Sequence, residues 1–317
     1  MAVSMLEFQQ QKNHELPLFT EETDIALPGK INPNTRYAFF TTIATGGKSL
    51  IKSCVDLHLR RRVCYKTLRP EFADNDIENL RLLREARISA MLQHPNTVPT
   101  YELGRDNRGH YYFTMKLIHG YTLREVLKFR ERYDLKQLLD VILQVASALA
   151  YAHSLGVLHR DIKPDNILVG PYGEVLLLDW GLAKVWSKGK SSLPDDAKID
   201  EVNAGLGMTG EGKLQGSVMY MSPEQVERDP NISFASDIYS LGAVLYETLT
   251  GNTPFQGDIV RELLDKIRHE TPVFPSSASQ EPLPPVLAEL TMQCLQKDPQ
   301  QRPSSAADIV HMIKERF

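Results

Sequence analysis

Apolar and polar residues alternate in segments between Tyr37 and about Tyr101, as they do in half-buried strands. The segment "SLIKSCVDLHL", residues 49–59, is rich in β-branched and short apolar residues, with Ile51 and Val55 in alternation. This pattern predicts a strand. Similar segments from Tyr37 to about Tyr101 predict that this region is mainly strands.

One helix is expected among these strands. Asn75 and Glu78 form a capping pair that marks its start. The dipeptide His94-Pro95 marks its end, because a residue before proline disfavours α geometry. The apolar face of this helix is expected to consist of Leu80, Leu83, Ile88 and Met91.

After "YYFTMKL", residues 111–117, the pattern becomes mainly helical to the end of the chain. Residues 141–158 carry no formal charge and nearly have the length of a membrane span. Polar residues interrupt this stretch, so we predict a helix buried at the centre of a large domain. These polar residues are Gln144, Ser147, His153 and Ser154.

Two segments lack a sustained apolar period. Residues 1–36 are polar with scattered prolines and are expected to form an extension or arm. Residues 187–217 are rich in glycine, serine and charge, and their composition predicts a long mobile loop.

Composition narrows the class of protein. A chain of 317 residues with 42% hydrophobic and 24% charged residues is an ordinary globular protein. The 36 basic and 40 acidic residues give a net charge of -4, so neither nucleic acid nor a membrane is expected as a partner. Three cysteines (Cys54, Cys64, Cys294) form no metal-ligand spacing or disulfide framework, and the N-terminus lacks a secretory layout. We expect a cytoplasmic location.

Residues 159–181, "HRDIKPDNILVGPYGEVLLLDWG", combine a hairpin with polar side chains. Two short apolar runs flank "GPYG", a turn signal. With the turn centred between Tyr172 and Gly173, Asn166 and Asp179 fall opposite each other. Their oxygen atoms suit Mg²⁺, which binds few protein ligands together with substrate phosphates. Asp161 and Lys163 precede this hairpin as a candidate base and a candidate phosphate-binding cation.

This stretch resembles the catalytic loop and metal-binding motif of protein kinases, H-R-D-x-x-x-x-N followed by D-F-G, with Trp in place of Phe. The resemblance implies that Asp161 accepts the proton of the substrate hydroxyl and that Asn166 and Asp179 hold Mg²⁺. Lys163 would neutralise the transferred phosphoryl group and implies a Ser or Thr substrate.

The kinase resemblance also implies the fold and the domain organisation. The fold class would be α+β and bilobal, with a small β-rich N-lobe that has one main helix and a larger, mainly helical C-lobe. The expected division is an arm at residues 1–36, an N-lobe at 37–115 and a C-lobe at 116–317. The cofactors would be ATP and Mg²⁺. The partners would be a protein substrate and, for autophosphorylation, a second copy of the chain.

Upstream, "VCYK", residues 63–66, is similar to the V-A-I-K strand of kinases. Lys66 would then contact the α- and β-phosphates of ATP, with Glu85 in "LLREAR" as its partner. "YYFTMKLIHG" resembles the hinge between kinase lobes. Met115 would be the gatekeeper, and backbone groups of Lys116 and Ile118 would face adenine.

The segment "TTIATGGKSLIKS", residues 41–53, contains Gly47-Lys48-Ser49 but is no nucleoside-triphosphatase P-loop. The first glycine of that motif would fall on Thr42, and a strand rather than a helix follows. Taken alone, the segment reads as a hairpin turn between strands. The kinase resemblance makes it the glycine-rich loop of the ATP site, of which one motif glycine is kept. Its ATP-binding positions would be Ala44, Gly46, Ser49 and Ile51, with Gly47 restoring freedom and Lys48 at the tip able to contact phosphate.

Downstream, "MSPEQ" stands where kinases have A-P-E, as in many bacterial members of the eukaryotic-like Ser/Thr kinase group. Glu224 of this motif is expected to pair with Arg302. Asp237, in "SDIYSLG", resembles a buried helical aspartate that braces the catalytic loop through backbone amides.

These residues favour an active Ser/Thr kinase. The alternative is a pseudokinase or nucleotide-binding scaffold, because the glycine-rich loop is degenerate. Five polar catalytic positions are intact, which favours the enzyme: Lys66, Glu85, Asp161, Asn166 and Asp179.

Phosphorylation is the expected switch. Thr209 lies in the predicted loop, and Arg160, beside Asp161, is a cation suited to a phosphothreonine. Glu211 would supply part of the same negative charge. Ser191 and Ser192 are alternative sites, but they lie farther from the substrate-facing turn at Ser217.

Overall fold

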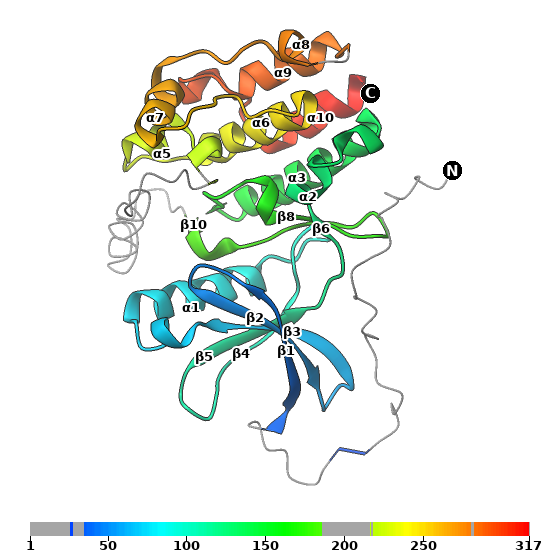
Figure 1. The fold of residues 1–317 in the computed structure, drawn as a ribbon, viewed down its shortest axis with the longest axis vertical. Coiled ribbons are helices and arrows are strands. Elements are labelled where there is room, and N and C mark those ends of the chain that lie inside the picture. The colour runs from blue at the N-terminus through cyan, green and yellow to red at the C-terminus, as the bar shows by residue number, and fades with distance from the viewer. Residues whose placement is uncertain (1–25, 28–34, 186–215, 217, 280–281, 317) are drawn as a thin grey trace. The chain divides into compact units, whose positions relative to one another are not determined.

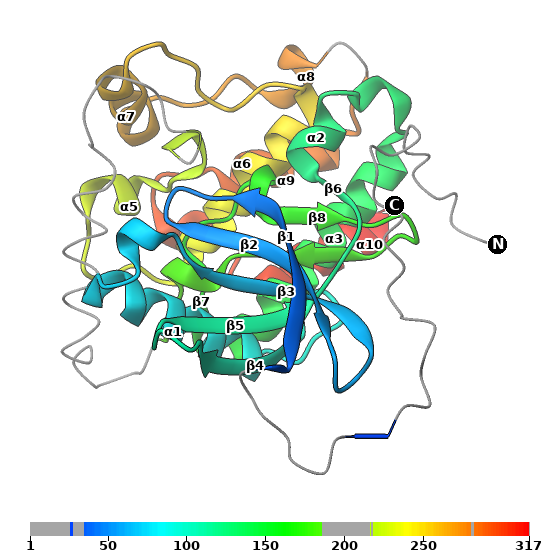
Figure 2. The same cartoon turned by 60° about the horizontal axis from the view of Figure 1, so that its bottom comes forward.

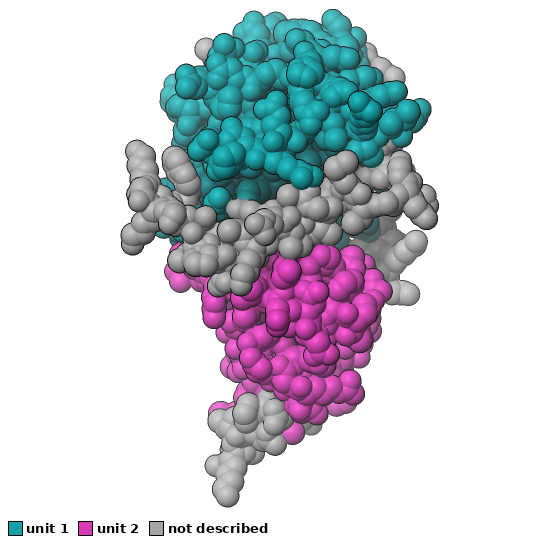
Figure 3. Space-filling model, turned by 90° about the vertical axis from the view of Figure 1, so that its left-hand side faces the viewer, with its two compact units in different colours: residues 1–6, 94–96, 120–317 teal, residues 7–93, 97–119 magenta. Residues whose placement is uncertain are grey.

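The computed structural model describes residues 26–27, 35–185, 216, 218–279 and 282–316. The chain forms two compact units, which Figure 3 distinguishes by colour. The β-rich unit comprises residues 97–119 together with the described residues up to Gln93, and the helical unit comprises His94–Asn96 and the described residues from Gly120 onward. This content confirms the predicted α+β class.

The β-rich unit is built on an antiparallel sheet with the strand order β1-β2-β3-β5-β4 (Figures 1 and 2). The first three strands follow one another as hairpins, and β5 crosses to pair with β3. The strands are β1 (Tyr37–Thr45), β2 (Ser49–Asp56), β3 (Arg61–Leu68), β4 (Thr100–Arg105) and β5 (Tyr111–Lys116).

Helix α1 (Asp76–Met91) packs on β3, β4 and β5. The Asn75 side chain accepts hydrogen bonds from the amides of Ile77 and Glu78, which confirms the predicted start. The predicted apolar face was largely wrong. Leu80 and Leu83 are half-buried and Met91 is 45% exposed.

The buried face of α1 mixes apolar and charged side chains, because the charged ones find partners within the β-rich unit. Its buried residues are Glu78, Arg81, Leu82, Glu85, Ala86 and Ile88.

The sheet has two different faces. Leu68 and Phe113 pack against Leu82 and Ala86 on the side of α1. An aromatic cluster lies on the opposite face because side chains alternate along each strand. This cluster consists of Tyr37, Tyr65 and Tyr112 with Cys54 and Val63.

The helical unit contains short sheets and a set of packed helices. Its strands are β6 (Tyr121–Thr122), β7 (Val157–Leu158), β8 (Ile167–Val169), β9 (Val175–Leu177) and β10 (Lys184–Val185). Its helices are α2 (Leu123–Leu127), α3 (Leu135–Ser154), α5 (Pro223–Glu227), α6 (Phe234–Thr250), α7 (Val260–His269), α8 (Pro275–Ala278), α9 (Pro285–Cys294) and α10 (Ala306–Arg316).

Helix α3 is the apolar helix that the sequence predicts. It packs against α6, α10 and β9, and Ile142, Val145 and Leu149 on it are fully buried. Its length and composition would also suit a membrane span, but half of its most apolar window is buried inside the structure. This burial fits the predicted role as a core helix.

Candidate active site

The backbone of residues 159–160 is held by a buried carboxylate on α6. Asp237 is fully buried, and its oxygens accept hydrogen bonds from the amides of His159 (2.8 Å) and Arg160 (2.9 Å). The predicted bracing role of Asp237 is thereby confirmed. His153 on α3, which the sequence reading missed, adds a third hydrogen bond of 2.8 Å through Nε2.

These hydrogen bonds determine the charge of Asp237. Burial alone would raise the pKa of its carboxyl. Hydrogen bonds from His153 and the His159 amide, with the charges of both histidines, outweigh burial and hold the pKa below its ordinary value. Asp237 is therefore ionised at neutral pH and fixes the start of the loop.

Arg160 adopts a left-handed backbone conformation, with φ of 68°. This conformation costs an L-residue free energy and persists only where the surroundings fix it. Three contacts do so here: the amide bonds Asp237, the carbonyl accepts a hydrogen bond from Gln225 (2.8 Å), and Nε donates to the carbonyl of Leu182 (2.6 Å). The strain lies directly before Asp161, as is typical of functional loops.

Asp161 is held by the two residues that the motif places beside it. Lys163 Nζ donates to both carboxylate oxygens, at 3.0 and 2.8 Å. Asn166 Nδ2 donates to the backbone carbonyl (2.8 Å) and to Oδ2 (2.9 Å) of Asp161. The carboxylate is thus fixed in orientation but remains 15% exposed.

The environment makes Asp161 more basic than an ordinary aspartate. Burial raises the pKa of its carboxyl, the ammonium of Lys163 opposes the rise, and the negative charge of Asp179 adds to it. A carboxylate with a raised pKa is better suited to accept a proton from a hydroxyl group.

The register of the β8–β9 hairpin corrects the predicted pairing. The strands pair Ile167 with Leu177 and Val169 with Val175, and Asn166 accepts a hydrogen bond from the amide of Leu178 rather than facing Asp179. The turn closes between Gly170 and Glu174 and has an odd number of residues. The prediction assumed a turn with an even number of residues, so the predicted pairing was wrong by one residue.

Asp179 follows β9 in a left-handed conformation, with φ of 61°. One carboxylate oxygen accepts a hydrogen bond from the amide of Gly181 (3.3 Å), and the residue is exposed. The next residue, Trp180, is buried with its ring edge-on to His159 at 4.5 Å between centroids. The buried tryptophan thus anchors the segment that presents the exposed carboxylate.

The donor set fits Mg²⁺. The amide nitrogen of Asn166 is used by Asp161, so oxygen is the atom that its side chain offers to a cation. Asp179 offers a carboxylate that is exposed. One or two such ligands, completed by water and phosphate oxygens, are what Mg²⁺ binds, and no dedicated protein cage is needed.

In the β-rich unit, Lys66 on β3 forms an ion pair with Glu85 on α1, with 2.5 Å between Nζ and Oε1. Both residues are buried, at 7% exposure each. A buried ion pair fixes the position of both groups, because separation would leave an uncompensated charge. The structure therefore brings together the two residues that the sequence pairs across 19 positions.

The predicted ATP loop is the β1–β2 hairpin. Ala44 lies opposite Ile51 in the register, and the amide of Gly46 donates to the carbonyl of Ser49 (2.9 Å). Ile51 also lies opposite Lys66 in the β2–β3 register. The loop residues therefore belong to the same part of the sheet as the Lys66–Glu85 pair.

Lys48 at the tip of this hairpin makes a different contact from the predicted one. Its Nζ pairs with Glu78 on α1, which also accepts a hydrogen bond from Arg81 (2.7 Å). The prediction that Lys48 contacts phosphate did not take its ion pair with Glu78 into account. Arg69 also contacts the loop, through its amide to Lys48 (2.9 Å) and its guanidinium to the Gly47 carbonyl (3.3 Å).

The comparisons with known proteins agree with this geometry. Residues 37–315 match the family described as protein kinase domain. The chain belongs to this family. Members of the family in general use ATP and Mg²⁺, so the donor set at Asn166 and Asp179 is in keeping with the family.

Curated relatives lie among bacterial kinases. The chain is 34% identical over 294 residues to serine/threonine-protein kinase PknD of Chlamydia caviae, covering 89% of this chain and 31% of that protein. It is 35% identical over 296 residues to PknD of Chlamydia pneumoniae, with 89% and 31% covered. It is 32% identical over 293 residues to PknD of Protochlamydia amoebophila, covering 88% of this chain and 29% of that protein. The chain spans about a third of the length of these relatives.

The segment predicted as the kinase hinge ends β5. Met115 lies opposite Cys64 in the β3–β5 register, and the amide of Lys116 donates to the carbonyl of Pro99 (3.0 Å). The Lys116 amide is therefore already hydrogen-bonded within the β-rich unit. Ile118 follows the strand and is partly buried.

The downstream ion pair of the kinase motif is present and buried. Arg302, 4% exposed, donates to both oxygens of Glu224, at 2.6 and 2.9 Å, which confirms the predicted pair. Ser236 donates to the same carboxylate at 2.6 Å. Burial would raise the pKa of Glu224, but these partners hold it below its ordinary value.

Sequence reasoning missed a polar network in the helical unit. Arg124 on α2 donates to Glu247 on α6 and to the hydroxyl of Tyr220, which in turn donates to Glu247 at 2.5 Å. Arg124 also reaches Asp165 of the catalytic loop at 3.4 Å. The partners of Arg124 lie 96 and 123 positions away in sequence, so no local spacing reveals them.

Of the two regulatory residues, only Arg160 is described. Thr209 and Glu211 lie outside the described residues.

Proposed function

We propose that this chain is an active Ser/Thr protein kinase that transfers the γ-phosphate of ATP to hydroxyl groups of proteins. The observation that carries the proposal is the fixed Asp161 carboxylate. Lys163 and Asn166 orient it, and Asp237 holds the backbone that precedes it. Phosphoryl transfer depends almost entirely on such positioning and on charge stabilisation.

The residues of the helical unit have separate roles in the chemical step. Asp161 accepts a hydrogen bond from the substrate hydroxyl and then its proton, and its raised pKa favours this role. Lys163, already beside Asp161, adds positive charge near the transferred group. Asn166 and Asp179 would hold Mg²⁺, which neutralises charge on the phosphates when it is bound with ATP.

The residues of the β-rich unit would bind the nucleotide. Lys66, fixed by Glu85, offers its ammonium to the α- and β-phosphates. Among the loop positions, Ala44, Gly46 and Gly47 are exposed, so phosphates can approach their backbone.

The test is transfer of radiolabel from ATP to the protein itself and to a generic substrate. Asp161→Asn, Asp179→Asn and Lys66→Met should each lower the rate, by about 10²- to 10⁴-fold for the loss of the base. Asp140→Asn, on the exposed side of α3, is the matched control and should keep the wild-type rate.

Undiminished labelling in the Asp161→Asn and Asp179→Asn proteins would contradict the proposal and point to a contaminating kinase. A wild-type protein that binds ATP with Mg²⁺ but labels nothing would support the scaffold function instead.

We further propose that phosphorylation of Thr209 activates the kinase, with Arg160 contacting the phosphate. Mass spectrometry of the autophosphorylated protein should find phosphate on Thr209, and Thr209→Ala and Arg160→Ala should lower the activity. A rate of autophosphorylation that is second order in protein would support reaction between two copies. Full activity of Thr209→Ala would contradict the switch.

A further inference from the structure

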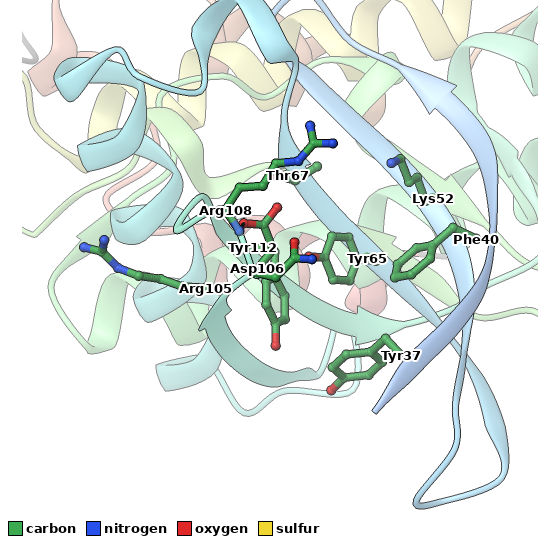
Figure 4. Close-up of a pocket in the computed structure, with 10 residues that line it drawn as sticks. Tyr37, Phe40, Lys52, Tyr65, Thr67, Arg105, Asp106, Arg108 and Tyr112 are labelled. Atoms are coloured by element: carbon green, nitrogen blue, oxygen red, sulfur yellow. Dashed lines mark hydrogen bonds between the residues drawn. The ribbon is translucent and has the colours of Figure 1, made fainter. Parts of the chain in front are cut away.

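A cavity of about 410 Å³ lies in the β-rich unit, over the aromatic cluster of the sheet (Figure 4). Tyr65 and Tyr112 stack with 4.4 Å between ring centroids, and Tyr37 meets both rings edge-on at 6.1 and 5.9 Å. Phe40 packs edge-on to Tyr65 at 5.1 Å and is 47% exposed. The cavity therefore has a rigid aromatic floor with one exposed ring beside it.

A bulge in β1 places Phe40 there. Ala38 pairs with Val55 and Thr41 pairs with Ser53. Two residues of β1, Phe39 and Phe40, therefore stand opposite one residue of β2, Cys54. A bulge re-aims the side chains of its strand. It brings Phe40 beside Lys52, whose ammonium lies 5.7 Å from the centroid of the ring.

The rim of the cavity is basic. Lys52 lies at one side and the exposed Arg108 at another, while Arg105 is directed away and stacks on Tyr111 (Figure 4). Asp106 is the acidic residue of the lining, and its Oδ1 accepts the amides of Arg108 and His110, both at 2.9 Å. Lys52 and Arg108 outnumber this single carboxylate, so the rim carries a net positive charge that would attract an anionic ligand.

This cavity is separate from the ATP-binding residues. Tyr65 and Thr67 line it, and Lys66, between them on β3, points to the α1 side of the sheet and pairs with Glu85. A ligand in the cavity would thus lie on the opposite face of the sheet from the Lys66–Glu85 pair.

The N-terminal segment of the chain has the chemistry that this cavity would bind. Residues 14–24, "HELPLFTEETD", contain four carboxylates and no Lys or Arg, together with Leu16, Leu18 and Phe19. Tyr37, which lines the cavity, follows Asp24 by 13 residues. These span up to about 45 Å when extended, so the segment can reach the cavity. Because the tether is short, the effective concentration of the segment at the cavity is on the order of 1 mM.

We propose that residues 14–24 dock in this cavity of their own chain, with apolar side chains on the aromatic floor and carboxylates at Lys52 and Arg108.

Hydrogen–deuterium exchange of the 317-residue chain at low salt tests the proposal. Amides of residues 15–24 should exchange about tenfold more slowly than in the free peptide. Lys52→Glu with Arg108→Glu should abolish this protection. Adding Glu21→Lys and Glu22→Lys to that variant should restore it, because the charges are then exchanged between the two sides.

Arg87→Glu with Lys128→Glu changes the net charge equally at exposed residues that do not line the cavity and should leave the protection intact. Amides of β3 and β5, measured in the same experiment, report whether each variant is folded.

Three results would overturn the proposal. These are free exchange of residues 15–24 in the wild type, protection that survives reversal of the rim charges, and protection that rises with protein concentration. The third result would assign the cavity to the segment of a second copy.

Discussion

Replacing Asp237 by Asn should destabilise the helical unit and disturb the catalytic loop together. The carboxylate accepts the amides of His159 and Arg160 and the imidazole of His153 within 2.9 Å, in a fully buried position. An Asn side chain keeps the shape but offers one oxygen and one NH₂ group. At least one backbone amide must then face a donor.

The magnitude follows from the lost partners. A buried donor without an acceptor costs about 1–3 kcal/mol. Arg160 also loses part of what holds its left-handed conformation, which itself stores about 1–3 kcal/mol. We therefore expect the free energy of unfolding to fall by about 3 kcal/mol, in the range for breaking a buried charged contact. The kcat should fall as well, because Asp161 follows Arg160 directly.

Denaturant titration monitored by tryptophan fluorescence measures the effect. Trp180 is buried beside His159 and reports on this loop. The control is Asp140→Asn on α3, an exposed change expected to stay within about 0.5 kcal/mol. Equal midpoints for the two variants, or a destabilised Asp237→Asn protein with wild-type kcat, would refute the reasoning.

The pH dependence provides a second check on Asp237. Because the folded pKa lies below the ordinary value, its contribution is fully present above the pKa of the unfolded chain, about 4. It is lost as the pH falls through the folded pKa. The stability difference between wild type and Asp237→Asn should therefore shrink in acid, as the pH falls below about 4.

Three further predictions concern binding, stability and acid–base chemistry. Ala44→Gly with Ser49→Gly should lower the KM for ATP more than it changes kcat, and unchanged affinity by calorimetry would mean that the loop does not limit binding. Arg302→Met should cost about 3–5 kcal/mol in denaturant titrations, because Glu224 is left buried without its cation, and adding Glu224→Leu should recover part of this loss. The activity kcat/KM should fall in acid with a midpoint above about pH 4, the ordinary aspartate value, because the pKa of Asp161 is raised. A midpoint at or below that value would contradict the role of Asp161 as base.

The sequence predicted contacts wherever a motif fixed both partners. Asp237 and the Glu224–Arg302 pair were found in this way, although 78 positions separate the latter two. The pairing of Asn166 failed by one residue, because the parity of the turn between Gly170 and Glu174 depends on backbone conformation.

The buried face of α1 was mispredicted for a different reason. Apolar periodicity assigns charged residues to solvent, whereas Glu78 and Glu85 are buried against cations of the same unit. The Arg124 network was missed because its members come from distant segments and no spacing links them. Tertiary partners thus decide the positions at which local patterns fail.

The degenerate glycine-rich loop was the main sequence argument for a scaffold without activity, and the structure weakens it. Gly46 and Gly47 are not among the residues with positive φ, so this conformation does not demand glycine. A side chain at Gly47 would meet nothing within 4 Å, whereas one at Gly46 would meet the Ser49 hydroxyl oxygen at 3.0 Å. The hairpin is instead held from outside, by Glu78 at its tip and by Arg69 at its backbone. A loop that is ordered by such contacts needs less of the freedom that glycine supplies, and the departures from the motif are compatible with catalysis.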